Sequence, residues 1–287
     1  MKKCIYLFAL LLTMCSCENF GVFEEDSIIK STTQPYVLCF LSPQDTVIQV
    51  TVKMTTPTVG EGSGSSNQYI SNARVVLRNE QNQEVILKWN EQLKKYLSSK
   101  SFFKIEARKQ YRLFVTTPKG DSVSASCIIP STIDSNTVSV TRAPFNPENP
   151  MASLPYYLRW KDIGNEKNYY AAFGLNYETD TLEHKTYLTG VDAQRTISDD
   201  NIQNGIIEYP IVGSIYPYKR LAKSHIGNFM FYICQTDEHY YRYHKEFSQI
   251  NDLPSSEPMK LYSNMTGGYG VFAGYNGVML RADKWYE

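Results

Sequence analysis

Residues 46–54 read TVIQVTVKM, a stretch in which β-branched side chains alternate with polar ones. Because successive side chains of a strand point to opposite faces, this alternation predicts a half-buried β-strand. Other strand-like runs, separated by turn-forming residues, lie at 36–41, 73–78, 84–89, 110–116 and 122–129. Several short strands at such spacing favour a β-sandwich, which we expect over residues 34–131.

The same pattern continues after residue 131 with longer and more aromatic strands. Candidate strands lie at residues 154–160, 168–177, 181–188, 206–212 and 228–235. We expect Trp160 to pack inside this tyrosine-rich sandwich. Because the chain exceeds the usual size of a single hydrophobic core, the sequence predicts a second domain over residues 132–287.

One amphipathic helix is predicted among the strands, at residues 237–250. Its apolar and aromatic residues recur three or four positions apart, which places them on one helix face: Tyr240, Tyr243, Phe247 and Ile250. The other face carries Arg242, Lys245, Glu246 and Gln249, and Asp237 can cap the first turn. We expect the aromatic face to pack into the core, and a ligand platform is the alternative.

The chain begins with MKKCIYLFALLLTMCSCE, which has the three-part layout of an export signal. Its apolar run, residues 5–12, is shorter than the about 20 residues of a membrane-spanning helix. The small residue Ser16 precedes Cys17, an ending that resembles the lipobox of bacterial lipoproteins. Cys17 is preferred to Cys15 because a small residue stands just ahead of it. We therefore expect residues 1–16 to be a signal peptide and Cys17 to carry the lipid.

Residues 17–33 are polar and acidic without a sustained period, and we expect them to form a tether between the lipid and the fold. Their acidic residues resemble the surface-export signal of Bacteroidota lipoproteins, which favours display at the cell exterior over retention in the periplasm. Ser27 lies in an Asp-Ser-Ile triplet that resembles the O-glycosylation sequon of exported proteins from these bacteria, so it is a candidate glycosylation site.

The charge balance and the cysteines exclude several classes of function. Lys2 and Lys3 leave with the signal, so the mature chain carries two more acidic than basic residues and has no basic cluster for nucleic acid. Beyond Cys17 three cysteines remain, and none has a metal-binding spacing: Cys39, Cys127 and Cys234. Cys39 and Cys127 either form a disulfide or, as we expect, stay buried thiols.

Catalytic motifs are missing from the sequence. His239 and His244 are five positions apart, so they diverge around a helix and cannot share a metal as an i, i+4 pair would. The chain contains no phosphate-binding loop, no G-x-S-x-G nucleophile elbow and no H-E-x-x-H motif. We therefore predict no catalytic residue, no metal site and no cofactor.

The closing segment, residues 257–275, is rich in glycine and tyrosine. Glycine permits positive φ and close backbone approach, so we expect a strand or loop packed tightly against another part of the chain. The segment resembles the end of a Bacteroidota lipoprotein family catalogued as domain of unknown function 4249. The resemblance rests on Pro258, Tyr262-Ser263-Asn264, Gly267-Gly268 and the stretch from Gly270 to Tyr275, and residues 72–75, 111–113, 129–130 and 159–162 agree with it.

The resemblance implies an all-β fold of two β-sandwich domains, immunoglobulin-like and then fibronectin type III-like. It also implies attachment to the outer membrane and association with a TonB-dependent, SusC-like transporter. It brings no catalytic residues to this chain. We expect contacts with partners at residues 55–67 and at surface tyrosines, since loops on a rigid sandwich commonly carry recognition.

Our hypothesis is a non-catalytic binding or accessory lipoprotein of a TonB-dependent nutrient-uptake system. A fimbrial structural lipoprotein is the first alternative. It is disfavoured because pilin maturation resembles cleavage after an early arginine, and the first arginine after Cys17 is Arg74, inside a predicted strand. An enzyme acting on glycan or peptide is the second alternative, and it would require two carboxylates facing each other across a cleft.

Overall fold

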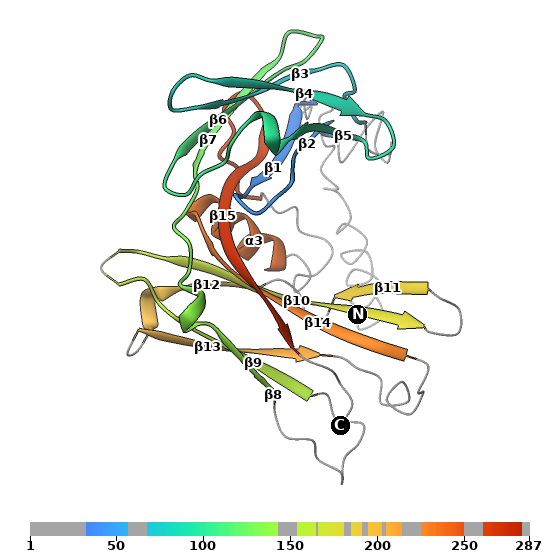
Figure 1. The fold of residues 1–287 in the computed structure, drawn as a ribbon. Coiled ribbons are helices and arrows are strands. Elements are labelled where there is room, and N and C mark those ends of the chain that lie inside the picture. Colours follow the sequence, from blue (N-terminus) through green and yellow to red (C-terminus); the bar gives the residue numbers. More distant parts are fainter. Residues whose placement is uncertain are drawn as a thin grey trace, which may run out of the picture. The chain divides into compact units, whose positions relative to one another are not determined.

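The fold is given by a computed structural model. It describes residues 33–56, 68–142, 154–164, 166–180, 185–190, 195–202, 205–213, 225–249 and 261–282 (Figure 1). The predicted signal peptide, Cys17, Ser27 and nearly all of the predicted tether lie outside these residues, as do residues 57–67 of the predicted contact loop.

The strands of the first half follow one another closely along the chain. They are β1 (Pro35–Leu41), β2 (Val47–Met54), β3 (Arg74–Asn79), β4 (Glu84–Asn90), β5 (Lys95–Ser99), β6 (Gln110–Thr116) and β7 (Ser122–Ile128). A short 3-10 turn, η2 (Lys100–Phe102), follows β5. In β2 the buried residues Ile48, Val50 and Val52 alternate with more exposed ones, which confirms the period-two prediction.

These strands hydrogen-bond in the order β1-β2-β5-β4-β3-β6-β7. Every one of them contributes at least one side chain to a single buried cluster, among them Val37, Val50, Val75, Leu87, Tyr96, Leu113 and Val123. A sheet whose strands all face one cluster must fold over on itself, so this half is sandwich-like.

The second half contains two groups of strands. β8 (Ser139–Arg142), β9 (Leu154–Lys161) and β13 (Ile206–Gly213) form a small sheet in the order β13-β9-β8. β10 (Tyr169–Asp180), β11 (Lys185–Gly190), β14 (His225–Thr236) and β15 (Tyr269–Ala282) pair in the order β11-β10-β14-β15, and β12 (Arg195–Ser198) pairs with β10. Two 3-10 turns, η3 (Ser135–Thr137) and η4 (Asp199–Asn201), lie between strands.

Both groups of strands share a core of their own. Trp160 is fully buried in it together with Tyr170 and Phe231, as predicted. The ring of Trp160 meets that of Tyr170 edge-on at 5.6 Å between centroids, a favourable aromatic geometry. The predicted all-β, sandwich-like fold class is confirmed, and the domain boundary at residue 131 stays a prediction.

Strand β15 belongs to both halves of the fold (Figure 1). Its first part pairs in parallel with β1, where Gly270 lies opposite Val37, and its second part pairs antiparallel with β14. Gly270 has φ of 114°, and a Cβ at this position would collide with the carbonyl oxygen of Val37. The predicted tight packing of the glycine-rich segment is therefore confirmed, and only glycine fits there.

The predicted helix at residues 237–250 is α3 (Glu238–Gln249). Tyr240 and Tyr243 are buried in a cluster with Ala171, Val271 and Ala273, so the core interpretation holds for these two tyrosines. It is wrong for Phe247, one turn later, which stacks on the ring of Tyr243 but is 51% exposed. The last turn of the helix therefore presents an aromatic ring to solvent. Ile250 lies outside the described residues.

The three cysteines of the described chain are buried free thiols, so Cys39 and Cys127 do not form the alternative disulfide. Burial raises the pKa of all three thiols, that of Cys234 to about 12. Such thiols are inert at neutral pH. Among the helices of the described ranges, none has the length and hydropathy needed to span a membrane.

Candidate functional site

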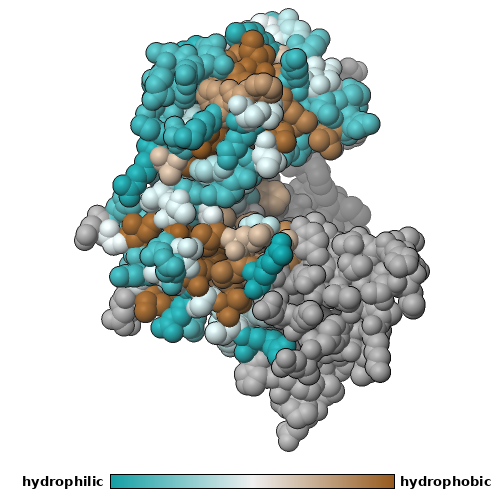
Figure 2. Space-filling view, in the orientation of Figure 1, coloured by the Kyte–Doolittle hydropathy of each residue, from teal (hydrophilic) through white to brown (hydrophobic). Residues whose placement is uncertain are grey.

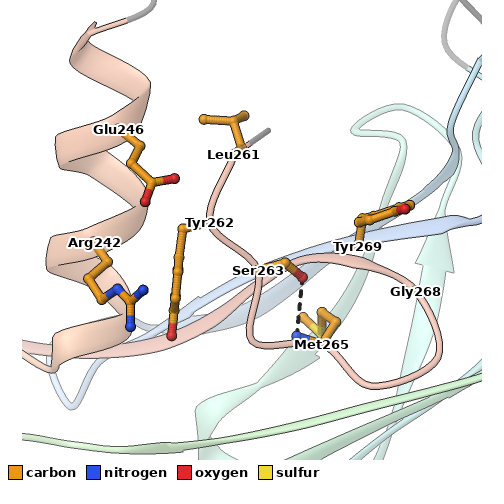
Figure 3. Close-up of a pocket in the computed structure, with 8 residues that line it drawn as sticks. All are labelled: Arg242, Glu246, Leu261, Tyr262, Ser263, Met265, Gly268 and Tyr269. Atoms are coloured by element: carbon orange, nitrogen blue, oxygen red, sulfur yellow. Dashed lines mark hydrogen bonds between the residues drawn. The ribbon is translucent and has the colours of Figure 1, made fainter. Parts of the chain in front are cut away.

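A pocket of about 440 Å³ lies between α3 and the segment of residues 261–269, which leads into β15 (Figure 3). Helix α3 contributes a basic and an acidic side chain. The segment contributes two tyrosines, a leucine and a methionine, together with a serine and a glycine. The lining consists of Arg242, Glu246, Leu261, Tyr262, Ser263, Met265, Gly268 and Tyr269.

Asp237 holds the first turn of α3 in place, and with it the side of the helix that lines the pocket. One carboxylate oxygen of Asp237 accepts the backbone N–H of Tyr240 at 2.8 Å, as predicted for a helix cap. The other accepts the backbone N–H of Gly274 in β15 at 2.9 Å, and the N–H of Asp237 donates to the carbonyl of Gly274 at 3.0 Å. Arg242 and Glu246, four residues apart, then project from the same side of the helix.

Burial raises the pKa of Asp237 from its ordinary 3.8 to about 7, although the backbone N–H groups of Tyr240 and Gly274 favour the charged form. The cost of removing the carboxylate from water therefore outweighs these hydrogen bonds. A pKa of about 7 means that the charge of Asp237 changes near neutral pH.

The other wall of the pocket, residues 261–268, is attached to two strands. The side chain of Asn264 donates to the carbonyl of Phe272 at 2.8 Å and accepts the N–H of Phe272 at 3.0 Å. Thr266 and Ser124 of β7 exchange backbone hydrogen bonds of 2.8 and 3.0 Å. These bonds hold the segment in place, with Ser263 and Met265 lining this pocket and Asn264 and Thr266 lining another.

Tyr262 is the most constrained side chain of the lining. Its hydroxyl shares a hydrogen bond of 2.7 Å with Nδ1 of His239, and the guanidinium carbon of Arg242 lies 4.2 Å from its ring centroid. Burial raises the pKa of Tyr262 and lowers that of His239. The hydrogen bond between these two neutral groups therefore fixes the ring of Tyr262, and Arg242 stacks on that ring by a cation–π contact.

Glu246 and Tyr269 complete the pocket with groups that a ligand can reach. Within the described ranges the Glu246 carboxylate has no hydrogen bond or ion pair, and Tyr269 is 41% exposed. Arg242 is loosely paired with Glu238, at 3.7 Å between the nearest nitrogen and oxygen. The pocket can therefore offer hydrogen-bond donors from Arg242, acceptors from Glu246 and aromatic surface to one ligand.

His244, on the face of α3 that packs on β1, has a different environment from His239. Its ring lies against Phe40 and Tyr240, at 5.0 and 4.3 Å between centroids. Burial lowers its pKa to about 4, and its Nε2 has no hydrogen-bond partner in the described structure. His244 therefore acts as a neutral ring of the core. In the described ranges no three metal-binding side chains come together.

The two residues assigned chemistry from the sequence, Cys17 and Ser27, lie outside the described part of the chain, so their roles stay predictions. Sequence patterns placed Arg242 and Glu246 on the polar face of a helix but gave no sign of what they face. Tyr262 and Tyr269 lie in the glycine-rich segment, for which the sequence predicted tight packing and not a binding site.

Comparison with known proteins identifies the family of the chain. No curated protein matches it. Among solved structures, it is similar to the chicken CNTN1 FN1-FN3 domains, with 12% sequence identity over 87% of this chain and 69% of that one. The TM-score of that match is 0.20, which is too low to support an argument. The model of the family described as Domain of unknown function (DUF4249) matches residues 23–281, and the chain belongs to this family.

Proposed function

We propose that this protein is a lipid-anchored, non-catalytic binding protein of the outer membrane, exposed at the cell surface, that serves a TonB-dependent transporter as an accessory subunit. The observation that carries the proposal is the pocket between α3 and residues 261–269, which combines aromatic rings with one accessible guanidinium and one accessible carboxylate. Ligand sites are typically concave surfaces of this size with a few polar groups that orient the ligand.

The composition of the lining favours binding over hydrolysis. It holds one carboxylate, that of Glu246, whereas most glycoside hydrolases use two carboxylates flanking the scissile bond. Arg242 is fixed by stacking on Tyr262, so its outward N–H groups are preorganised as donors. Preorganised polar groups beside aromatic surface give affinity because little side-chain freedom is lost on binding.

The exposed surface supports association with another protein. Figure 2 shows apolar side chains gathered in patches on this face of the molecule rather than spread evenly over it. Large apolar residues are also exposed singly in the first half of the chain, where Ile86, Leu93 and Phe102 are 57%, 59% and 80% exposed. Exposed apolar patches on soluble domains commonly mark interaction sites, which fits a transporter partner.

The binding part of the proposal is tested with the lipidated protein in detergent, by calorimetry against a panel of neutral oligosaccharides and short peptides. We expect at least one compound to bind, and Arg242→Ala and Tyr269→Ala each to weaken its binding about tenfold. Arg159→Ala, an exposed arginine of β9 outside the pocket, is the matched control and should bind like the parent. A compound that binds all four proteins equally would place the ligand site elsewhere.

The partner is tested by gentle extraction of membranes and purification of the tagged protein. We expect a TonB-dependent transporter to co-purify in stoichiometric amount. Recovery of the protein alone, after extraction conditions that preserve other membrane complexes, would contradict the accessory role. Ladders of polymer in unboiled samples would instead favour the fimbrial alternative.

A further inference from the structure

A second pocket, of about 260 Å³, opens beside β6 and β7. It shares a wall with the first, the segment of residues 261–268, in which neighbouring residues of the stretch 263–266 line different pockets. Ser263 and Met265 line the first pocket, and Asn264 and Thr266 line the second. The complete lining is Arg112, Phe114, Ser124, Ala125, Ser126, Asn264 and Thr266.

The strand pattern places a basic side chain and hydroxyl groups together on the outer face of the sheet. In β6 the buried residues Tyr111, Leu113 and Val115 face the core, so Arg112 and Phe114 face outward. The register sets Arg112 opposite Ser126 of β7, and Phe114 opposite Ser124. Side chains directly opposite each other on one face are neighbours.

Arg112 carries a positive charge that the described protein does not neutralise. Its neighbour across the other strand pair is Arg78 of β3. Arg78 is satisfied, since it is ion-paired with Glu84 and lies 4.8 Å from the ring centroid of Phe114. Arg112 has no ion pair or hydrogen bond among the described residues. Of these two opposing arginines, Arg112 is therefore the one that can take an anion from solution.

The hydroxyl groups of the pocket are also available. The hydroxyl groups of Ser124, Ser126 and Thr266 make no hydrogen bond within the ranges that the structure describes. The bonds between Thr266 and Ser124 involve only their backbones. Asn264 is fully engaged with Phe272 and Ser126 and therefore supports the wall rather than a ligand. A guanidinium beside several hydroxyl donors matches the geometry of an oxyanion, which arginine binds in a bidentate manner.

We propose that the second pocket binds an oxyanion, a carboxylate, phosphate or sulfate group, through Arg112 with help from the hydroxyls of Ser124, Ser126 and Thr266. Its volume is below the about 300 Å³ at which pockets enclose drug-sized ligands, so it suits a single acidic group or one acidic sugar ring. The proposal does not depend on what the first pocket binds.

The test uses the full-length protein in detergent and titrates it with acetate, phosphate or sulfate at constant ionic strength, with glucose as the uncharged probe. We expect saturable millimolar binding of at least one anion and none of glucose, and the anion that binds identifies the chemical source. Arg112→Gln should weaken this binding about tenfold or more, as expected for loss of a charge-assisted hydrogen bond.

Arg74→Gln is the matched control, because Arg74 is exposed on the same outer sheet face, outside the pocket, and its loss changes the net charge equally. It should bind like the parent, and Ser126→Ala should weaken binding less than Arg112→Gln does. Thermal unfolding of each variant confirms that it is folded. Absence of anion binding in the parent, or equal binding by the parent and the folded Arg112→Gln protein, overturns the proposal, and so does an equal loss in Arg74→Gln.

Discussion

The carboxylate of Asp237 lies 2.9 Å from the backbone nitrogen of Gly274 and thereby ties the first turn of α3 to β15. Gly274 lies at the last position of β15 that pairs with β1, next to the first that pairs with β14. One side chain therefore fixes the helix that carries Arg242 and Glu246 at the point where β15 passes from one half of the fold to the other.

Asp237→Ala is expected to lower the free energy of unfolding by about 2 to 4 kcal/mol. It removes a helix cap and leaves the buried N–H of Gly274 without an acceptor, and each loss costs about 1 to 2 kcal/mol. Chemical denaturation measures the change. Asp134→Ala removes the cap of η3, which is exposed, and should cost less than about 1 kcal/mol. Equal effects of the two substitutions would contradict the role of Asp237 as a buried link.

Asp237 and His244 should change the free energy of unfolding in opposite directions as pH rises. Between pH 4 and 7 folded Asp237 holds a proton that the unfolded chain has released, so it makes the free energy of unfolding fall as pH rises. Between pH 4 and 6.5 the unfolded chain holds a proton on His244 that the folded protein lacks, so this group makes stability rise with pH. In the parent protein the two contributions largely cancel below pH 6.5.

Single substitutions separate these contributions. Between pH 4 and 7 the free energy of unfolding of Asp237→Asn should rise relative to that of the parent, by at most about 4 kcal/mol. This limit follows because each pKa unit corresponds to about 1.4 kcal/mol. His244→Phe, which keeps an aromatic ring among Phe40 and Tyr240, should lose stability by at most about 3 kcal/mol between pH 4 and 6.5. Chemical denaturation at several pH values measures both changes in the free energy of unfolding. Parallel pH profiles for the three proteins would show that neither group has the shifted pKa.

Gly270→Ala is expected to destabilise the protein by more than about 3 kcal/mol, because the new Cβ combines an unfavourable positive φ with a collision against Val37. Gly120→Ala isolates the first of these effects. Gly120 has φ of 93° and no atom near its missing Cβ, so this substitution should cost only about 1 to 2 kcal/mol. Thermal unfolding compares them, and a Gly270→Ala protein as stable as Gly120→Ala would show that β15 shifts to accommodate the methyl group.

Local patterns in the sequence predicted the local parts of this fold. The alternation of residues 46–54 gave a strand, and the spacing of Tyr240 and Tyr243 after a capping Asp237 gave a helix, because these signals depend on near neighbours. The parallel pairing of β15 with β1 joins segments more than 200 residues apart in the chain, and no periodicity encodes such a partner.

The pocket was unpredictable for the same reason. It exists because the polar side of α3 faces residues 261–269, an arrangement set by the link from Asp237 to Gly274 and by the bonds of Asn264 to Phe272. Phe247 also illustrates this limit, since its spacing matches the buried tyrosines but the packed surface does not extend to it. A helical period gives the face of a residue, and tertiary contacts decide whether that face is covered.

The proposed lipid anchor gives a prediction that separates membrane attachment from folding. The buried clusters of the two halves are built from residues 37–280, so Cys17→Ala should leave thermal unfolding and circular dichroism unchanged. Without the acyl chains, which contribute about 0.8 kcal/mol per buried methylene, the protein should move from the membrane to the soluble fraction. Fractionation after a high-salt wash measures the change.

Cys15→Ala is the matched control for the choice of acylated residue, because Cys15 lies two positions earlier in the predicted signal. If the signal is cut after Ser16, Cys15 is discarded and its substitution should leave the protein on the membrane. Release by Cys15→Ala but not by Cys17→Ala would move the lipid to Cys15. Retention of both variants after the wash would mean that no acyl chain at either cysteine is needed, since a salt wash removes proteins held by charge alone.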